Sequence, residues 1–213
     1  MDDAGGFAEI PTTVMADVLG RRQVMDSGVR PLWSPVPRVA GPAFTVRCPP
    51  GDNLMLHAAI YRAIPGSVLV VAAGDADYAV AGGNVCAVAQ RRGIAAFVVD
   101  GVIRDLAEVR EAGFPVFARG VVPVAGVKAA TAPLNEPVQC GGVIVRAGDI
   151  VVADDDGVLV VPAERRQQAL RDGQAKAQAD SAQALDMWEA EHHARIERIL
   201  AARGFEHTAT GRE

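Results

Sequence analysis

The stretch Gly82-Gly83-Asn84-Val85, followed after one helix and one strand by Val99-Asp100-Gly101-Val102-Ile103-Arg104-Asp105, carries the strongest structural signal in this chain. The first segment places a glycine pair at the start of a predicted helix. The second runs from a predicted strand into an adjacent cation and carboxylate. N–H groups at a helix start attract carboxylate or phosphate, an Arg can hold a further oxygen atom, and an Asp can ligate a divalent metal. We therefore expect a small anionic ligand and metal-assisted chemistry here.

The segments around this stretch predict an α/β fold. Ser67 to Ala72 and Ile94 to Val99 are continuously apolar, as is typical of strands buried on both faces. Helices are expected at residues 53–63, at 84–92 before Gly93, and at 105–112 before Gly113. This alternation implies parallel strands joined by right-handed crossovers.

The flanking regions complete a single predicted domain over residues 1–213, with a core at about 10–165. A helix is expected at 12–19, capped by Thr12 or Thr13, and a strand at 41–48. Short strands without helices between them are expected at 115–118, 121–124, 139–146, 150–153 and 158–161, forming a mainly antiparallel or mixed layer. A long C-terminal helix at about 163–203 would carry one apolar stripe, made of Leu185, Trp188, His192, Ile196 and Ile199. It would cover its own sheet or a neighbouring subunit.

Composition excludes several classes of function. The chain has 213 residues, half of them apolar, and a net charge of −5 without a basic stripe, so we expect no nucleic-acid partner. Neither a signal peptide nor a membrane-spanning run is recognisable, so we expect a cytoplasmic protein without a membrane partner. Cys48, Cys86 and Cys140 are odd in number and widely spaced, which favours reduced thiols.

The two glycine-rich and charged segments have structural as well as functional interpretations. Asp105 and Glu108 could form a capping-box-like helix start, and Arg104 could be a surface charge. Gly82 and Gly83 could simply mark a tight turn. The functional interpretation gains from position, because α/β folds bind ligands at the carboxyl ends of parallel strands.

Other motifs point to structure rather than chemistry. Dinucleotide and P-loop glycine spacings are absent, and no Ser-His-Asp arrangement can be assembled. His57 is expected on an apolar helix face, and His192 and His193 cannot face one metal from a regular helix. Residues 154–157, Asp-Asp-Asp-Gly, are interpreted as a hairpin turn. Cys86 has no nearby His to act as a base.

Taken together, these motifs resemble the RraA-like family, which includes the divalent-metal-dependent 4-hydroxy-4-methyl-2-oxoglutarate/4-carboxy-4-hydroxy-2-oxoadipate aldolases. The matching segments cover roughly residues 10–165. They are 49–54 (PPGDNL), 57–60 (HAAI), 65–71 (PGSVLVV), 82–85 (GGNV), 92–93 (RG), 98–105 (VVDGVIRD) and 148–157 (GDIVVADDDG).

The resemblance implies a layered α/β/β/α sandwich of the swivelling β/β/α type that assembles as trimers or hexamers, with sites near subunit interfaces. It implies a class II aldolase or oxaloacetate decarboxylase acting on a small anionic 2-keto acid through a pyruvate enolate. Arg104 would bind the substrate and polarise its C2 carbonyl. Asp105 would ligate Mg²⁺ or Mn²⁺. The backbone of Gly82, Gly83, Asn84 and Val85 would hold the pyruvyl carboxylate.

One departure from the family pattern affects the expected chemistry. The aldolases typically carry an acidic residue twenty-one positions before the Arg, where this chain has Gly83. Family members use that carboxylate to hold a metal-bound water that serves in proton transfer. Asn84, Asp75 or Asp77 are candidates to replace it. Two further functions stay open, namely an RraA-type regulator that binds ribonuclease E and a lyase for a different small acid. The regulators usually lack the Asp that follows Arg104, so Asp105 favours the enzyme.

Overall fold

The computed structural model describes residues 4–205, and the chain divides into two compact units, residues 1–174 and 175–213. The helices are α1 Ala4–Ala8, α2 Thr12–Leu19, η1 Arg21–Gln23, α3 Leu54–Ile60, α4 Gly83–Arg91, α5 Leu106–Glu111, η2 Ala163–Arg165, α6 Arg166–Ala182 and α7 Leu185–Ala202. The strands are β1 Arg30–Pro31, β2 Val39–Arg47, β3 Val68–Ala72, β4 Ala96–Ile103, β5 Val116–Val121, β6 Val138–Cys140, β7 Val143–Val145, β8 Ile150–Asp154 and β9 Gly157–Val161.

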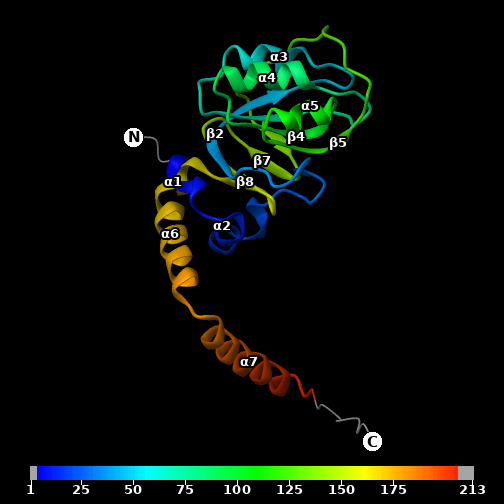
Figure 1. Cartoon of the computed structure of the whole chain (residues 1–213). Helices are drawn as coiled ribbons and strands as arrows, with labels where there is room; N and C mark the ends of the chain where they lie inside the picture. The colour runs from blue at the N-terminus through cyan, green and yellow to red at the C-terminus, as the bar shows by residue number, and fades with distance from the viewer. Residues whose placement is uncertain (1–3, 206–213) are drawn as a thin grey trace, which may run out of the picture. The chain divides into compact units, whose positions relative to one another are not determined.

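Among the described residues, seven strands form one mixed sheet in the order β1-β5-β4-β3-β2-β8-β9. Figure 1 labels β2, β4, β5 and β8 of this sheet. Strands β2 to β5 pair in parallel, as expected for strands that alternate with helices. The outer pairings β1–β5, β2–β8 and β8–β9 are antiparallel. The sheet is nearly closed, because Val24 forms a bridge with Leu159 and the Met25 N–H donates to the Val158 carbonyl. The expected α/β fold is therefore confirmed.

Strands β3 and β4 are buried on both faces, which explains their continuous apolar runs. Leu69 and Phe97 belong to a helix-side core that also contains Leu56 of α3, Cys86 of α4 and Val109 of α5. The alternate residues of the same strands belong to a hairpin-side core with β6 to β9, whose members include Val68, Val70, Ala96, Val98, Val138, Val145, Val151 and Val160. Helices α3, α4 and α5 lie together over one face of the sheet (Figure 1).

The antiparallel region differs from the sequence-based expectation at two places. The expected strand at 121–124 is wrong, because β5 ends at Val121 and Pro123 cannot donate to a sheet ladder. The expected single strand at 139–146 is the β6–β7 hairpin. Its turn residues Gly141 and Gly142 have φ of 55° and 78°, a pair of left-handed conformations that suits glycine and a tight hairpin. The hairpin turn expected at 154–157 is confirmed between β8 and β9.

Helix α2 has the expected bounds but a different N-terminus. Pro11 occupies the N-cap, and Thr12 does not cap the helix. The Thr12 hydroxyl and N–H instead donate to the carboxylate of Asp154, over 2.5 and 3.0 Å. Asp154 is buried, and it also accepts a hydrogen bond from Arg38. The first acid of the Asp-Asp-Asp-Gly motif therefore fastens α2 and the segment before β2 to the sheet.

The expected continuous C-terminal helix is wrong, because Gln183 and Ala184 interrupt it. Ala184 has an extended backbone, with φ −67° and ψ 144°, so α6 and α7 are separate helices. In the first unit, α6 packs through Ala169 and Gly173. In the second unit, α7 has no buried residue. Leu185, Trp188 and Ile199 of the expected apolar stripe are exposed, and its other two residues are half-buried. Trp188 and His192 stack within α7 at a ring separation of 4.5 Å. Among the described residues, no helix is long and apolar enough to cross a membrane.

A bulge in β4 controls where the chain leaves the sheet. The β4–β5 register shifts between Val99 and Val102, at Asp100 and Gly101. A Cβ on Gly101 would collide with the Cβ of Ala73 and lie 3.1 Å from the Asp75 carbonyl oxygen. Only glycine therefore lets β4 approach the segment after β3 at this point.

We predict that Gly101→Ala lowers the free energy of unfolding by about 1–3 kcal/mol, because the added methyl group overpacks against backbone that cannot yield cheaply. Gly120→Ala is the matched control on β5, since its Cβ would meet only the Cγ1 of Val102 at 4.0 Å. Urea unfolding at one protein concentration measures both variants. Equal stabilities for the two variants would contradict the requirement for close approach at Gly101.

Candidate functional site

The site begins where the chain after β3 rejoins the end of β4. The Val80 N–H donates to the Val102 carbonyl and the Arg104 N–H donates to the Ala81 carbonyl, both over 3.0 Å. Residues 79–81 therefore run alongside the last residues of β4 in the manner of a further parallel strand. This pairing brings the start of α4 against Arg104 and Asp105, as the sequence pattern predicted.

The glycine pair is explained by close approach rather than by backbone conformation. Gly82 is extended, with φ −154°, and neither Gly82 nor Gly83 has a positive φ. A Cβ on Gly82 would collide with the Asp105 carboxylate and lie 3.0 Å from Cγ of Arg104. A Cβ on Gly83 would collide with the side chain of Glu108. The tight-turn interpretation of this pair is therefore wrong.

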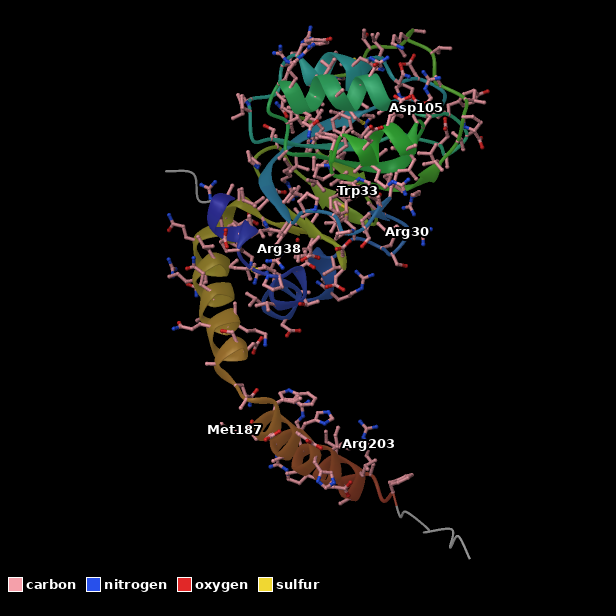
Figure 2. The ribbon with its side chains drawn as sticks, viewed as in Figure 1. Arg30, Trp33, Arg38, Asp105, Met187 and Arg203 are labelled. Atoms are coloured by element: carbon pink, nitrogen blue, oxygen red, sulfur yellow. The ribbon has the colours of Figure 1, made fainter. Side chains whose placement is uncertain are left out.

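Asp105 reaches the site through a left-handed backbone, with φ 57° and ψ 41°. Such a conformation is uncommon outside glycine and often marks a functional position. Its Oδ2 accepts a hydrogen bond from the Gly83 N–H over 3.1 Å and lies 3.5 Å from Nε of Arg104. Asp105 forms no side-chain cap on α5, so the capping-box interpretation is not supported. Asp105, labelled in Figure 2, lies where α4 and α5 come together.

The first turn of α4 offers donors beside this pair. The Cys86 N–H is already bonded to the Gly82 carbonyl over 3.0 Å. The N–H groups of Asn84 and Val85 precede it, so no carbonyl of their own helix can accept from them. A helix start with two such groups and a nearby guanidinium is suited to a carboxylate.

These groups line a small cavity of about 70 Å³, bounded by Asn53, His57, Ala79, Ala81, Gly82, Asn84, Val85, Arg104, Asp105, Ala125 and Lys128. Arg104 and Asp105 also border a more open cavity of about 280 Å³, whose other walls are Leu106, Val121, Val122 and Pro123. Both charged side chains are therefore accessible from two sides. Among the described residues, the guanidinium of Arg104 has no polar contact except that to Asp105.

Asn53 contributes an unpaired acceptor to this cavity. Its side-chain nitrogen donates to the Ala79 and Gly126 carbonyls, over 3.4 and 3.2 Å, which sets the orientation of the amide. The amide oxygen is buried and has no hydrogen-bond partner among the residues that the structure describes. Because a buried acceptor without a partner is costly, this atom calls for a donor from a ligand or a water. Asn53 is the N-cap residue of α3, but its side chain makes no capping hydrogen bond there.

His57 and Lys128 provide further polar groups. Burial lowers the pKa of His57, and the positive charge of Lys128 lowers it further, so the imidazole is neutral at pH 7. His57 was expected to be a core residue, but it lines the cavity. No sequence pattern marks Lys128 as a site residue, because it lies in an irregular segment. The bridges that join Asp52 to Val127 and Ala79 to Ala125 bring this segment to the site.

The remaining candidates lie elsewhere or are inert. Asp75 accepts hydrogen bonds from the N–H groups of Gly51, Asp77 and Tyr78 and borders a different cavity, so the structure does not place it as a replacement for the missing carboxylate. Asp77 follows it in the same exposed turn. Burial, and then the charge of Asp105, raises the pKa of Cys86 to about 12, so its thiol is not a nucleophile.

Asp105 supplies the carboxylate that lines both cavities of this site. No cluster of three or more His, Cys, Asp or Glu side chains is arranged to hold a metal within residues 4–205. Asp105 alone fits Mg²⁺ or Mn²⁺, because such hard ions keep several waters and take one or two carboxylates together with substrate oxygens. Its side chain is 38 % exposed, and Oδ1 has no protein partner among the described residues.

Known proteins share this sequence and fold. A family profile described as RraA-like, Aldolase/RraA, matches residues 3–160. A Halalkalibacterium halodurans protein named "Putative 4-hydroxy-4-methyl-2-oxoglutarate aldolase" is 40 % identical over 200 residues, which cover 93 % of this chain and 91 % of that protein. A Burkholderia multivorans protein of the same name is 37 % identical over 66 % of this chain and 85 % of its own length.

A solved structure gives the same result for the fold. Streptomyces coelicolor RraAS2, described as an unusual member of the RNase ES inhibitor RraA protein family, superposes with a TM-score of 0.74 and 33 % identity. The match covers 84 % of this chain and 93 % of RraAS2. From the family profile, the relatives and this superposition together, we conclude that the chain belongs to the RraA-like family.

Proposed function

We propose that this protein is a divalent-cation-dependent lyase that acts on small 2-keto acids through a pyruvate enolate, by retro-aldol cleavage of 4-hydroxy-2-oxo acids, by oxaloacetate decarboxylation, or by both. The main support is the Arg104–Asp105 pair, which lies against the open first turn of α4 beside a cavity with an unpaired amide oxygen. The relatives named as aldolases support the same reaction class.

The substrate carboxylate is assigned to the start of α4. The N–H groups of Asn84 and Val85 donate to it, and the positive end of the helix favours its charge. The Arg104 guanidinium, which lies 3.5 Å from the Asp105 carboxylate, donates to the C2 carbonyl oxygen. As the C3–C4 bond breaks, negative charge grows on that oxygen. A cation held beside it therefore stabilises the transition state more than the ground state.

Asp105 is assigned to Mg²⁺ or Mn²⁺. A cation bound there supplies Lewis-acid stabilisation of the oxygen charge that develops on the 2-keto acid. The hydrogen bond from Gly83 and the contact from Arg104 both engage Oδ2 of Asp105, which leaves Oδ1 directed elsewhere. The backbone of Asp105 is held in its left-handed conformation by the start of α5, so the carboxylate is pre-oriented for a ligand.

Asn53 is assigned to the substrate hydroxyl. Its amide nitrogen is occupied by two carbonyl groups, so its buried oxygen is the amide atom left for a donor from a bound molecule. A 4-hydroxy-2-oxo acid brings a hydroxyl donor to that oxygen, whereas oxaloacetate carries no hydroxyl at C4. The same cavity therefore holds a means of distinguishing the two substrates.

Association into trimers or hexamers belongs to the same proposal. Val121, which lines the more open cavity with Arg104, is 48 % exposed. Val124 and Val127, which precede Lys128 in the chain, are 52 % and 62 % exposed. A group of exposed valines beside a polar site is typical of a surface that a further subunit covers.

A regulator that binds ribonuclease E is the second candidate function, favoured by the similarity to RraAS2. Binding to a protein partner requires neither the unpaired Asn53 oxygen nor a carboxylate at residue 105. A pull-down of purified ribonuclease E with and without EDTA separates the two functions, because the lyase alone depends on a cation.

We predict that the protein releases pyruvate from oxaloacetate with Mg²⁺ or Mn²⁺, and that EDTA or Asp105→Ala lowers the rate by at least about 10²-fold, because transition-state charge loses its stabilisation. Coupled lactate dehydrogenase measures the pyruvate. Asp156→Asn, an exposed acid in the β8–β9 turn, is the control and should keep the wild-type rate. A rate that neither EDTA nor Asp105→Ala changes would exclude Asp105 as the metal ligand.

We also predict that Asn53→Ala reduces kcat/KM for a 4-hydroxy-2-oxo acid about 10- to 100-fold more than kcat/KM for oxaloacetate, because only the hydroxy acid loses a hydrogen bond to a buried acceptor. The ratio of the two values is the measurement, since loss of the loop contacts to Ala79 and Gly126 affects both substrates alike. An unchanged ratio would rule out the hydroxyl assignment.

A further inference from the structure

The carboxylate of Glu108 lies against Gly83, at the start of α4. A Cβ on residue 83 would stand 3.0 Å from Cβ of Glu108, 2.9 Å from its Cδ, and nearer still to Oε2. The end of the Glu108 side chain therefore occupies the space in which a side chain at residue 83 would begin. Glycine at 83 is what makes this placement sterically possible.

The backbone of α5 explains how Glu108 arrives there. Asp105 is the N-cap residue of α5, and Glu108 follows three residues later on the same side of the helix. Helices α4 and α5 lie next to each other on the helix-side core through Cys86, Ala89 and Val109. One short helix thus directs two carboxylates, Asp105 and Glu108, toward the glycine pair.

A structural role for Glu108 has no support in its contacts. A capping box would join the Glu108 side chain to the Asp105 N–H, and no such bond forms. Within residues 4–205, the Glu108 carboxylate takes part in no hydrogen bond or ion pair. The side chain is exposed and lines neither of the two cavities, but its carboxylate lies over Gly83, whose N–H binds Asp105.

The proposed reaction needs a group that carries one proton. In retro-aldol cleavage the C4 hydroxyl loses its proton and the C3–C4 bond breaks. The electron pair of that bond becomes the C2–C3 double bond of the enolate, while C4 becomes a carbonyl carbon. The enolate is then protonated at C3 to give pyruvate. In the bound substrate the hydroxyl donates to the Asn53 oxygen. As the bond breaks, its proton passes instead to one carboxylate, which returns it to C3, so atoms and charge balance. In decarboxylation, CO₂ leaves and the C3 proton comes from water.

We propose that Glu108 carries this proton, in place of the side-chain carboxylate that Gly83 cannot supply. This inference rests on the proposed lyase function. Asp105 is less suited, because its Oδ2 is engaged by Gly83 and Arg104 and it is assigned to the cation. His57 and Lys128 belong to α3 and to the segment after β5, and their contribution is an outcome of the test.

The test follows proton transfer separately from bond cleavage. Wild-type protein with Mg²⁺ should exchange the methyl protons of pyruvate for deuterium in D₂O, measured by ¹H NMR. Glu108→Gln keeps the shape of the side chain and should slow this exchange by at least about 10²-fold. Its affinities for Mn²⁺ and for pyruvate, measured by calorimetry, should change less than threefold. Glu111→Gln, an exposed acid on the same helix, is the matched control and should exchange at the wild-type rate.

A double variant tests whether a carboxylate at residue 83 can replace the carboxylate at residue 108. Glu108→Ala removes the carboxyl end that would collide with a side chain at residue 83 and leaves its own Cβ 3.0 Å away, so Gly83→Asp in that background can restore a carboxylate there. The double variant should exchange at least tenfold faster than Glu108→Ala alone. Thermal unfolding shows whether each variant is folded.

The outcomes separate the two proposals. Exchange by Glu108→Gln within threefold of the wild type overturns the role of Glu108, and a large loss in His57→Gln instead assigns the proton to His57. Weakened Mn²⁺ or pyruvate binding in Glu108→Gln, by tenfold or more, also overturns it and makes Glu108 a positioning residue. Wild-type protein that neither exchanges pyruvate nor cleaves oxaloacetate with any divalent cation overturns the lyase function itself.

Discussion

Two backbone hydrogen bonds organise the candidate site, namely Val80 N–H to Val102 and Arg104 N–H to Ala81. They align residues 79–81 with the end of β4, and α4 begins immediately after them. Without this alignment the start of α4 and the Arg104–Asp105 pair would belong to separate loops. With it, helix N–H groups, a guanidinium and a carboxylate share a few ångströms of space. The bulge at Gly101 and its close approach to Ala73 set the direction in which β4 arrives.

Small residues provide the space for polar ones in this region. Gly82, Gly83 and Gly101 all have backbone angles that other residues can adopt, and each is crowded by a neighbour. The unusual backbone conformation is at Asp105 instead, where the functional carboxylate is oriented. This division is physically sensible, because a side chain on either glycine of the pair would displace a carboxylate from the helix start.

The contacts of Arg104 and Arg119 show why the cavity of about 70 Å³ is a better candidate for the functional site than the cavity of about 530 Å³. Arg119 borders a cavity of about 530 Å³, but its guanidinium is bound by both oxygens of Asp26, over 3.1 and 3.0 Å, and by Asp100. These carboxylates raise the pKa of Arg119, and they leave it little capacity for a ligand. Arg104 has one 3.5 Å contact and is 44 % exposed. The smaller cavity also holds the unpaired oxygen of Asn53.

The local sequence predicted the parallel strands, helix α2 and the β8–β9 turn, because hydrophobic periodicity and the residues that interrupt it are visible in the sequence. It also predicted that residues 82–85 lie close to Arg104 and Asp105, because the carboxyl ends of parallel strands meet at one edge of a sheet. The predicted single strand at 139–146 is wrong, because Gly141 and Gly142 form the turn of a hairpin. The predicted continuous helix is wrong at Gln183 and Ala184, because the Ala- and Gln-rich stretch there carries no signal for a break.

The sequence by itself thus determined the fold class, the family resemblance and the central residues of the site, since each is encoded within a few neighbouring positions. Only the tertiary structure revealed the unpaired oxygen of Asn53, the cavity positions of His57 and Lys128, and the Glu108 carboxylate over Gly83. These features depend on distances between segments that lie far apart in the chain or on neighbouring helices. No pattern within a single segment carries that information, because packing against the rest of the fold sets those distances.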